Sequence, residues 1–196
     1  AFRLIWVTCP KLHDLQRPTE GRMQITIDGK KSSPLRLLLA HGAGAPSDSD
    51  FMNQITALLV ERGLCVGRFE FPYMQKRRGD GKKRPPDREP ILRQAFQEAV
   101  TEFNPKGKPC FIGGKSMGGR LATMVAADNE VDVAGIVCLG YPFHPTGRPE
   151  KLRTAHLENI AVPTLIAQGE RDPFGNLAEF ASYAIQNCQI ELLWLA

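Results

Sequence analysis

From residue 22 onward the sequence alternates continuous apolar runs with segments whose apolar residues recur every three to four positions. Short apolar runs bounded by turn residues predict buried strands, and the three-to-four spacing predicts amphipathic helices. Strands are predicted at residues 23–27, 35–40, 64–71, 109–113, 134–139, 162–168 and 189–195. Helices are predicted at residues 50–62, 90–103, 117–128 and 177–187.

This alternation predicts an α/β fold with a mostly parallel sheet and helices on both faces. Strands that are apolar along their whole length are buried on both sides, as they are in parallel sheets covered by helices. Met23–Ile27 instead alternates apolar and polar residues, which is typical of a half-exposed edge strand. We expect one domain over residues 21–196, whereas residues 1–20 form an N-terminal extension of uncertain origin.

Composition narrows the classes of protein that remain. No apolar run approaches the roughly 18 residues that a membrane span needs, and no signal peptide is recognisable. The five cysteines are odd in number and form no Cys-x-x-Cys pair, which favours a reducing compartment such as the cytoplasm. No Cys/His pair has the spacing of zinc ligands, so we expect no metal. We expect no organic cofactor either, and without a long apolar run we expect no membrane partner.

Positive charge is concentrated between Lys76 and Arg88, where seven basic residues meet two acidic ones in a chain of net charge +4. Nucleic-acid-binding domains spread basic residues over a face and interleave aromatics, so we expect no nucleic-acid partner. Glycines and paired prolines in this segment predict an exposed, mobile loop. It is either a solvated loop or a site that attracts an anionic substrate or partner.

The first candidate for chemistry is Ser116, in the sequence Gly114-Lys115-Ser116-Met117-Gly118 between a predicted strand and a predicted helix. In a nucleophile elbow this turn strains the serine backbone, so the residues two before and two after must be tiny. The helix that starts at Met117 would direct its positive end toward the serine oxygen. The alternative is a glycine-rich turn with an incidental serine.

The second candidate is the turn His41-Gly42-Ala43-Gly44 after the strand at 35–40. Acyl transfer needs two backbone N–H groups directed at the developing oxyanion. We expect them at Met117 and Ala43, with Gly44 as the alternative to Ala43. His41 is expected to brace the turn, because the usual chain order is serine, acid, histidine.

Asp172 is the candidate acid, because it follows the strand at 162–168, in the place of a triad aspartate. An Asp-Pro turn former is the alternative for Asp172, and Glu170 is expected to be a structural or surface carboxylate. Residues 140–160 are the one candidate for a short lid. Of its histidines, His144 and His156, we expect packing roles, with substrate binding by His144 as the alternative.

Several segments resemble one family: residues 41–45, 69–74, 113–120, 140–154 and 169–175. They are similar to the small predicted α/β-hydrolases, which are related to the hydrolase-like domain of a subunit of a chromatin-acetylating complex and to testis-expressed hydrolase-like proteins. The resemblance implies the α/β-hydrolase fold and either hydrolase activity or a role in interactions. It also implies a catalytic histidine after the last strand.

That histidine is missing from the sequence, since His13, His41, His144 and His156 all precede Asp172. We therefore expect the natural chain to continue with a histidine shortly after Ala196. The leading hypothesis is a serine hydrolase that cleaves an ester or related small-molecule acyl substrate. The alternative is a non-catalytic interaction domain that docks an acidic partner on the segment Lys76–Arg88.

Overall fold

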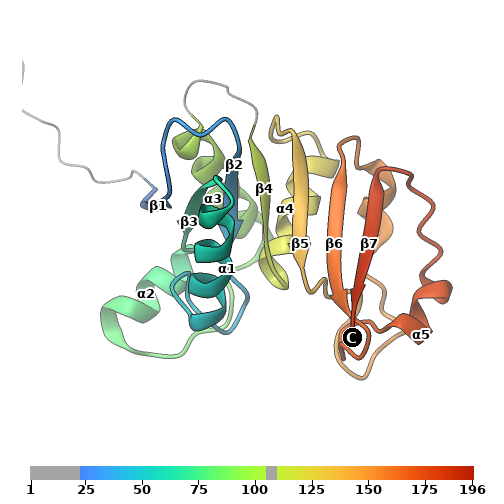
Figure 1. Cartoon of the computed structure of the whole chain (residues 1–196). Helices are drawn as coiled ribbons and strands as arrows, with labels where there is room; N and C mark the ends of the chain where they lie inside the picture. Colours follow the sequence, from blue (N-terminus) through green and yellow to red (C-terminus); the bar gives the residue numbers. More distant parts are fainter. Residues whose placement is uncertain (1–22, 105–109) are drawn as a thin grey trace, which may run out of the picture.

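The computed structural model describes residues 23–104 and 110–196, through which one seven-stranded sheet runs in the order β1-β3-β2-β4-β5-β6-β7 (Figure 1). The strands are β1 (Ile25–Asp28), β2 (Arg36–Ala40), β3 (Cys65–Phe69), β4 (Phe111–Lys115), β5 (Gly135–Leu139), β6 (Thr164–Gly169) and β7 (Ile190–Leu195). All neighbouring strands are parallel except β1 and β3, which are antiparallel. The predicted mostly parallel sheet and the predicted edge strand are therefore confirmed.

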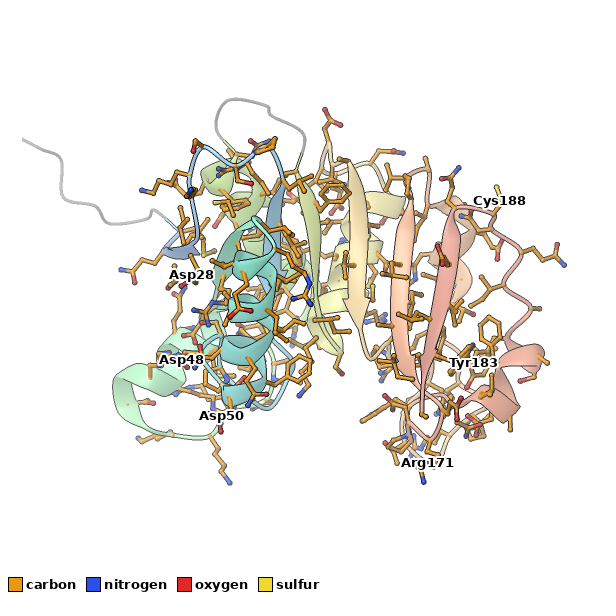
Figure 2. All side chains as sticks on the ribbon, in the orientation of Figure 1. Asp28, Asp48, Asp50, Arg171, Tyr183 and Cys188 are labelled. Atoms are coloured by element: carbon orange, nitrogen blue, oxygen red, sulfur yellow. The ribbon has the colours of Figure 1, made fainter. Side chains whose placement is uncertain are left out.

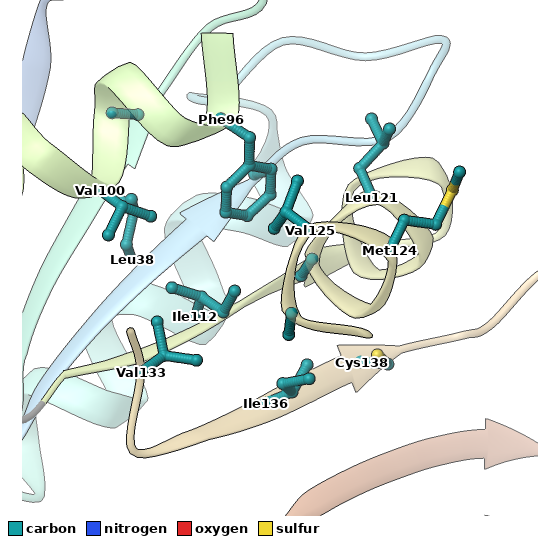
Figure 3. Packing of buried hydrophobic residues seen from close by; sticks show 14 of the residues in the cluster. Leu38, Phe96, Val100, Ile112, Leu121, Met124, Val125, Val133, Ile136 and Cys138 are labelled. Atoms are coloured by element: carbon teal, nitrogen blue, oxygen red, sulfur yellow. The ribbon is translucent and has the colours of Figure 1, made fainter. Parts of the chain in front are cut away.

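The helices divide between the two faces of the sheet (Figure 1). They are α1 (Asp50–Glu61), α2 (Pro72–Asp80), α3 (Glu89–Phe103), α4 (Met117–Ala127) and α5 (Leu177–Phe180), with 3₁₀ turns at Ala155–Asn159 and Ala181–Tyr183. The larger core lies under α3 and α4, where Phe96 and Val125 lie above Ile112 of β4 (Figure 3). A smaller core under α1 contains Leu37 and Leu39, because successive side chains of β2 point to opposite faces.

No helix in the described ranges covers the other face of β5, β6 and β7 (Figure 1). An apolar groove of about 370 Å³ runs beside α1 on that face and is lined by Phe111, Val137 and Leu165 among others. Along β7, Leu193 and Leu195 remain 47% and 50% exposed. One face of the last strands therefore presents apolar surface.

The prediction of an unstructured loop over Lys76–Arg88 is wrong for its first part. Helix α2 begins with Pro72 in its first turn and continues to Asp80, ending at Gly81, whose φ is 70°. Arg78 pairs with Glu70 and with Asp48, both at 2.6 Å, in the region where α2 approaches α1 (Figure 2). The carboxylates of Glu70, just before α2, and of Asp48, thirty residues before Arg78, thus neutralise the positive charge of Arg78. Considered alone, the segment carries like charges that repel one another.

The helix predicted at 177–187 is also shorter than expected. Asn176 starts α5 with a capping box to Glu179, but regular structure stops at Tyr183. Tyr183 turns inward and its hydroxyl donates to Glu179 at 2.9 Å, and Ala184 then adopts a left-handed φ of 51°. That backbone conformation ends a helix.

Two further predictions concern the whole chain. None of the helices within residues 23–104 and 110–196 combines the length and the hydropathy needed to cross a bilayer. Cys65, Cys110 and Cys138 are buried free thiols, as their apolar surroundings in the sequence predict. The extension at residues 1–20 lies outside the described residues.

Candidate active site

Ser116 lies at the turn between β4 and α4, with φ 50° and ψ −112°. Only two other non-glycine residues in the described part of the chain have positive φ, and this conformation is costly for a residue with a Cβ. Its N–H donates to the carbonyl of Leu139 in β5 at 3.0 Å, and its own carbonyl accepts from the N–H of Arg120 at 3.0 Å. The predicted strained strand–turn–helix is confirmed.

The glycines of this turn are required by the close approach of β2. A Cβ built on Gly114 would lie 2.3 Å from the carbonyl oxygen of Ala40, and one on Gly118 would lie 2.5 Å from the same atom. Both distances are far inside van der Waals contact with backbone that cannot move aside. The serine turn is therefore pressed against the end of β2, from which the turn at His41–Gly44 continues.

Ala43 and Met117 line one cavity of about 360 Å³ together with Ser116. Neither the Ala43 N–H nor the Met117 N–H donates a hydrogen bond to another residue in the described ranges. Both N–H groups are therefore unused within the described ranges, in residues that line the cavity with Ser116, and Met117 lies at the positive end of α4. Gly44, the alternative donor, does not line this cavity.

His41 holds the shape of the turn from below. Its ring is fully buried, Nδ1 donates to the Gly42 carbonyl at 2.7 Å, and Nε2 accepts from the Phe71 N–H at 3.2 Å. Burial lowers the pKa of His41, so the ring stays neutral. With both nitrogens occupied, His41 braces the backbone as predicted and does not contact Ser116.

Two residues that the sequence did not single out complete this support. The Tyr73 hydroxyl donates to the Ala43 carbonyl at 2.9 Å, and the Glu70 carboxylate accepts from the N–H and hydroxyl of Ser47 at 3.1 and 3.2 Å. Burial would raise the pKa of Glu70, but hydrogen bonds from Arg78 hold it below its ordinary value. The sequence signals were the family resemblance of residues 69–74 and a polar residue at the end of an apolar strand.

Asp172 lies on the turn after β6. Strand β6 is separated by β5 from β4, which leads into Ser116, and both turns follow the carboxyl ends of their strands. Its Oδ1 accepts from the Phe174 N–H at 2.9 Å, while Oδ2 lies 3.5 Å from the point where a Cβ on Gly140 would be. Gly140 directly follows Leu139, the residue that binds the Ser116 N–H. The carboxylate therefore faces the end of the strand next to the serine turn, partly exposed.

Gln168, fully buried in β6, connects this turn to the segment after β5. Its Oε1 accepts from the Tyr141 N–H at 2.6 Å, and its Nε2 donates to the carbonyls of Tyr141 and Gly175 at 3.2 and 2.9 Å. Asp172 lies in the turn between Gln168 and Gly175, and the Gln168 side chain connects this turn to Tyr141. A glutamine inside an otherwise apolar strand was a signal that the sequence analysis missed.

The structure does not bring His144 to the cavity. This side chain is only 2% exposed, and its ring nitrogens contact the Pro145 carbonyl at 2.9 Å and the Glu179 carboxylate at 3.0 Å. Burial would lower the pKa of His144, but these two partners raise it. The alternative of substrate binding by His144 is not supported, because the ring packs toward α5 instead.

His156 is held away from Ser116 as well, by the hydroxyls of Thr123 at 2.9 Å and Tyr141 at 3.2 Å. Burial lowers the pKa of His156 to about 4. Within residues 23–104 and 110–196, no histidine forms a hydrogen bond with Ser116 or Asp172. His13 lies outside the described residues.

Several solved structures of hydrolases and hydrolase homologues share this arrangement of strands and helices. A dienelactone hydrolase from Anabaena variabilis has a TM-score of 0.69 and 20% identity, with 90% of this chain and 81% of that chain covered. An alpha-beta serine hydrolase homologue from Coxiella burnetii has 0.67 and 20%, with 87% and 80% covered. Est1E from Butyrivibrio proteoclasticus, solved with ferulic acid bound, has 0.65 and 15%, with 88% and 85% covered.

At these identities the likeness establishes the fold alone. The sequence itself goes further, because residues 33–196 match the family model of an alpha/beta hydrolase domain, and this range contains every described candidate residue. The chain therefore belongs to the alpha/beta hydrolase family.

Proposed function

We propose that this protein is a serine hydrolase that cleaves an ester or related acyl compound with Ser116 as nucleophile. One observation carries the proposal. Ser116 has a strained backbone on the floor of a cavity of about 360 Å³, beside two unused N–H groups, those of Ala43 and Met117. Strain of this kind is retained where the surrounding structure imposes it, and such places are often functional sites.

In the proposed reaction the Ser116 hydroxyl attacks the substrate carbonyl carbon, and the N–H groups of Ala43 and Met117 stabilise the oxyanion that forms. Loss of one such donor typically costs about 10²–10³ in rate. The oxyanion then collapses, the bond from the carbonyl carbon to the leaving group breaks, and the alcohol or thiol departs with the proton that was taken from Ser116. Water attacks the resulting acyl-serine and releases the acid and free Ser116. Asp172 contacts and orients the histidine that takes the serine proton.

We propose that this histidine lies outside the described residues, and the family resemblance implies that it follows the last strand. The supporting observation is that the Asp172 carboxylate lies free of any ion pair or histidine contact within the described ranges, next to Gly140 at the end of β5. Without a base, only about 10³–10⁴-fold catalysis over water would remain. His13 is the other unplaced histidine.

Turnover of a matched substrate series tests this function. The complete natural chain is assayed on p-nitrophenyl esters, the corresponding thioesters and the corresponding anilides. We expect ester or thioester hydrolysis that Ser116→Ala abolishes and that Ser182→Ala, a change at an exposed serine near α5, leaves intact. Equal rates for wild type and Ser116→Ala would contradict the proposal.

A non-catalytic interaction domain is the second candidate, and the absence of a described histidine beside Ser116 favours it. The resemblance to a hydrolase-like domain of a chromatin-acetylating complex subunit points the same way. In that case an acidic partner would bind the segment Lys76–Arg88, and a serine-directed probe would not react with Ser116. The three buried thiols support a reducing, cytoplasmic location for either function.

A further inference from the structure

Two arginines share the cavity of Ser116. Arg120 and Arg153 line it together with the serine, and apolar side chains that include Leu92, Leu121 and Pro142 form its walls. The two guanidinium groups come from different elements, α4 and the segment that follows β5. Their presence beside a proposed nucleophile is not needed for the attack, the oxyanion or the proton transfer.

Arg120 lies four residues after Ser116 and therefore on the same face of the helix start. Its Nε is buried and has no hydrogen-bond partner in the described ranges. Among the described residues its one ion-pair partner is Glu89, at 3.8 Å, which is too far for a hydrogen bond, and Glu89 also lies 3.7 Å from Arg93. Arg120 thus has donor capacity that no side chain in the structure uses.

The backbone of Arg153 is fixed from two sides. Its N–H donates to the Phe143 carbonyl at 2.7 Å, and its carbonyl accepts from the Tyr141 hydroxyl at 3.1 Å. Its guanidinium forms no ion pair within the described part of the chain. Burial, followed by the positive charge of Arg120, lowers the pKa of Arg153. A partly buried, unpaired cation beside a second cation is unfavourable unless an anion joins them.

The two acidic residues that line the cavity, Asp87 and Glu89, do not supply that anion. Asp87 accepts a hydrogen bond from the N–H of Tyr73 at 2.8 Å, which places its carboxylate at the first turn of α2. Glu89 is shared between Arg93 and Arg120 at the long distances given above. Arg153 is left without a counter-charge, although the cavity is neutral when its formal charges are summed.

We propose that Arg120 and Arg153 bind a carboxylate carried by the substrate, so that the protein selects acyl esters with an anionic end. This inference rests on the proposed function, because it places the reacting carbonyl at Ser116. A short hydrocarbon spacer lies against Leu92, Leu121 and Pro142, and the carboxylate accepts from both guanidinium groups. Arginine suits this role, because its planar fork matches a carboxylate with two hydrogen bonds.

Binding without turnover tests the proposal separately from catalysis. The complete chain with Ser116→Ala is titrated by calorimetry at low salt with monomethyl glutarate and with its neutral amide analogue, methyl 5-amino-5-oxopentanoate. The two ligands differ only in the terminal charge. We expect the carboxylate to bind at least about tenfold more tightly, and the difference to shrink as salt rises.

Added Arg153→Gln should remove most of this preference, and added Arg120→Gln should reduce it. Arg148→Gln is the matched control, since Arg148 is an exposed arginine of the same segment outside the cavity, and the same charge is lost. Thermal unfolding of each variant establishes that it is folded. Equal affinity for the two ligands, failure of both to bind, or an equal effect of Arg148→Gln would overturn the proposal.

The outcomes for the two proposals are distinct. A carboxylate preference that depends on Arg153, in a wild-type chain that hydrolyses no ester, would support the binding site and contradict the hydrolase function. Ester hydrolysis that Ser116→Ala abolishes, without any preference for the carboxylate ligand, would support the function and contradict the arginine site.

Discussion

The two sides of the proposed site are held in different ways. On the serine side, buried strands fix the turn, and Gly114 and Gly118 leave no room between it and Ala40. On the acid side, Asp172 stands on a partly exposed turn that Gln168 ties to the segment after β5. The proposed nucleophile and oxyanion donors thus lie on turns fixed by buried strands, whereas the proposed acid is positioned by a few polar contacts.

The largest effect is expected from a substitution of Asp172, which should lower activity and leave the free energy of unfolding nearly unchanged. We expect Asp172→Asn in the complete chain to lower ester hydrolysis by about 10³–10⁴-fold, because the histidine loses the group that orients it. Stability should change little, since asparagine can still accept from the Phe174 N–H. Steady-state kinetics with urea unfolding gives both quantities. Glu170→Gln, an exposed neighbour, is the control, and an equal loss there would show that Asp172 is not the acid.

On the serine side, a substitution in the turn should destabilise the fold itself. Gly118→Ala puts a Cβ 2.5 Å from the Ala40 carbonyl and 2.7 Å from that of His41. We expect a loss of about 3 kcal/mol in the free energy of unfolding, because two backbone segments must separate. Gly79→Ala on α2 meets nothing within 4 Å and should change stability by less than about 1 kcal/mol in urea unfolding. Similar values for the two variants would contradict this account of the turn.

Loss of the Gln168 hydrogen bonds, which connect the turn of Asp172 to the segment after β5, should lower the free energy of unfolding by somewhat less. Gln168→Leu leaves the N–H and carbonyl of Tyr141 and the carbonyl of Gly175 without their buried partner. Unsatisfied buried polar groups cost about 1–3 kcal/mol, so we expect about 2 kcal/mol in urea unfolding. The rate of ester hydrolysis should fall as well, because Asp172 loses its fixed position. Gln186→Leu, at an exposed position, should affect neither quantity, and a silent Gln168→Leu would refute the tie.

The smallest effect concerns pH. Burial lowers the pKa of His156 to about 4 in the folded chain, from 6.5. The folded state therefore binds fewer protons, so the stability that His156 contributes is complete above pH 6.5 and is lost as the pH falls toward 4. After allowance for partial exposure we expect about 1 kcal/mol between pH 7 and pH 5. Urea unfolding of wild type and His156→Gln should show a steeper decline in the wild type, and parallel declines would contradict the shift.

Sequence reasoning was accurate where the signal was local. The glycines around Ser116 predicted the strained turn, and Ala43 of the His-Gly turn after β2 lines the same cavity as Ser116, as its proposed role as a donor requires. Both follow from sterics that act within a few residues. The strands were predicted to within about two residues for the same reason, since continuous apolar runs mark buried parallel strands.

Reasoning failed where distant residues decide the outcome. Helix α2 forms although its segment carries like charges, because Glu70 and Asp48 bind Arg78. The packing role expected of His144 depends on Glu179, thirty-five residues away, which the sequence did not identify as its partner. The unpaired guanidinium of Arg153 beside Arg120 depends on the path of the irregular segment after β5, which no periodicity describes.

The central claim is that Ser116 is an activated nucleophile. Its most direct test is a fluorophosphonate probe applied to the complete natural chain, with peptide mass spectrometry to locate the adduct. We predict rapid, stoichiometric labelling on the peptide that contains Ser116, absent in Ser116→Ala and unchanged in Ser182→Ala. No labelling of Ser116, or labelling of equal rate at other serines, would contradict the claim and leave a hydrolase fold that does not act as a serine hydrolase.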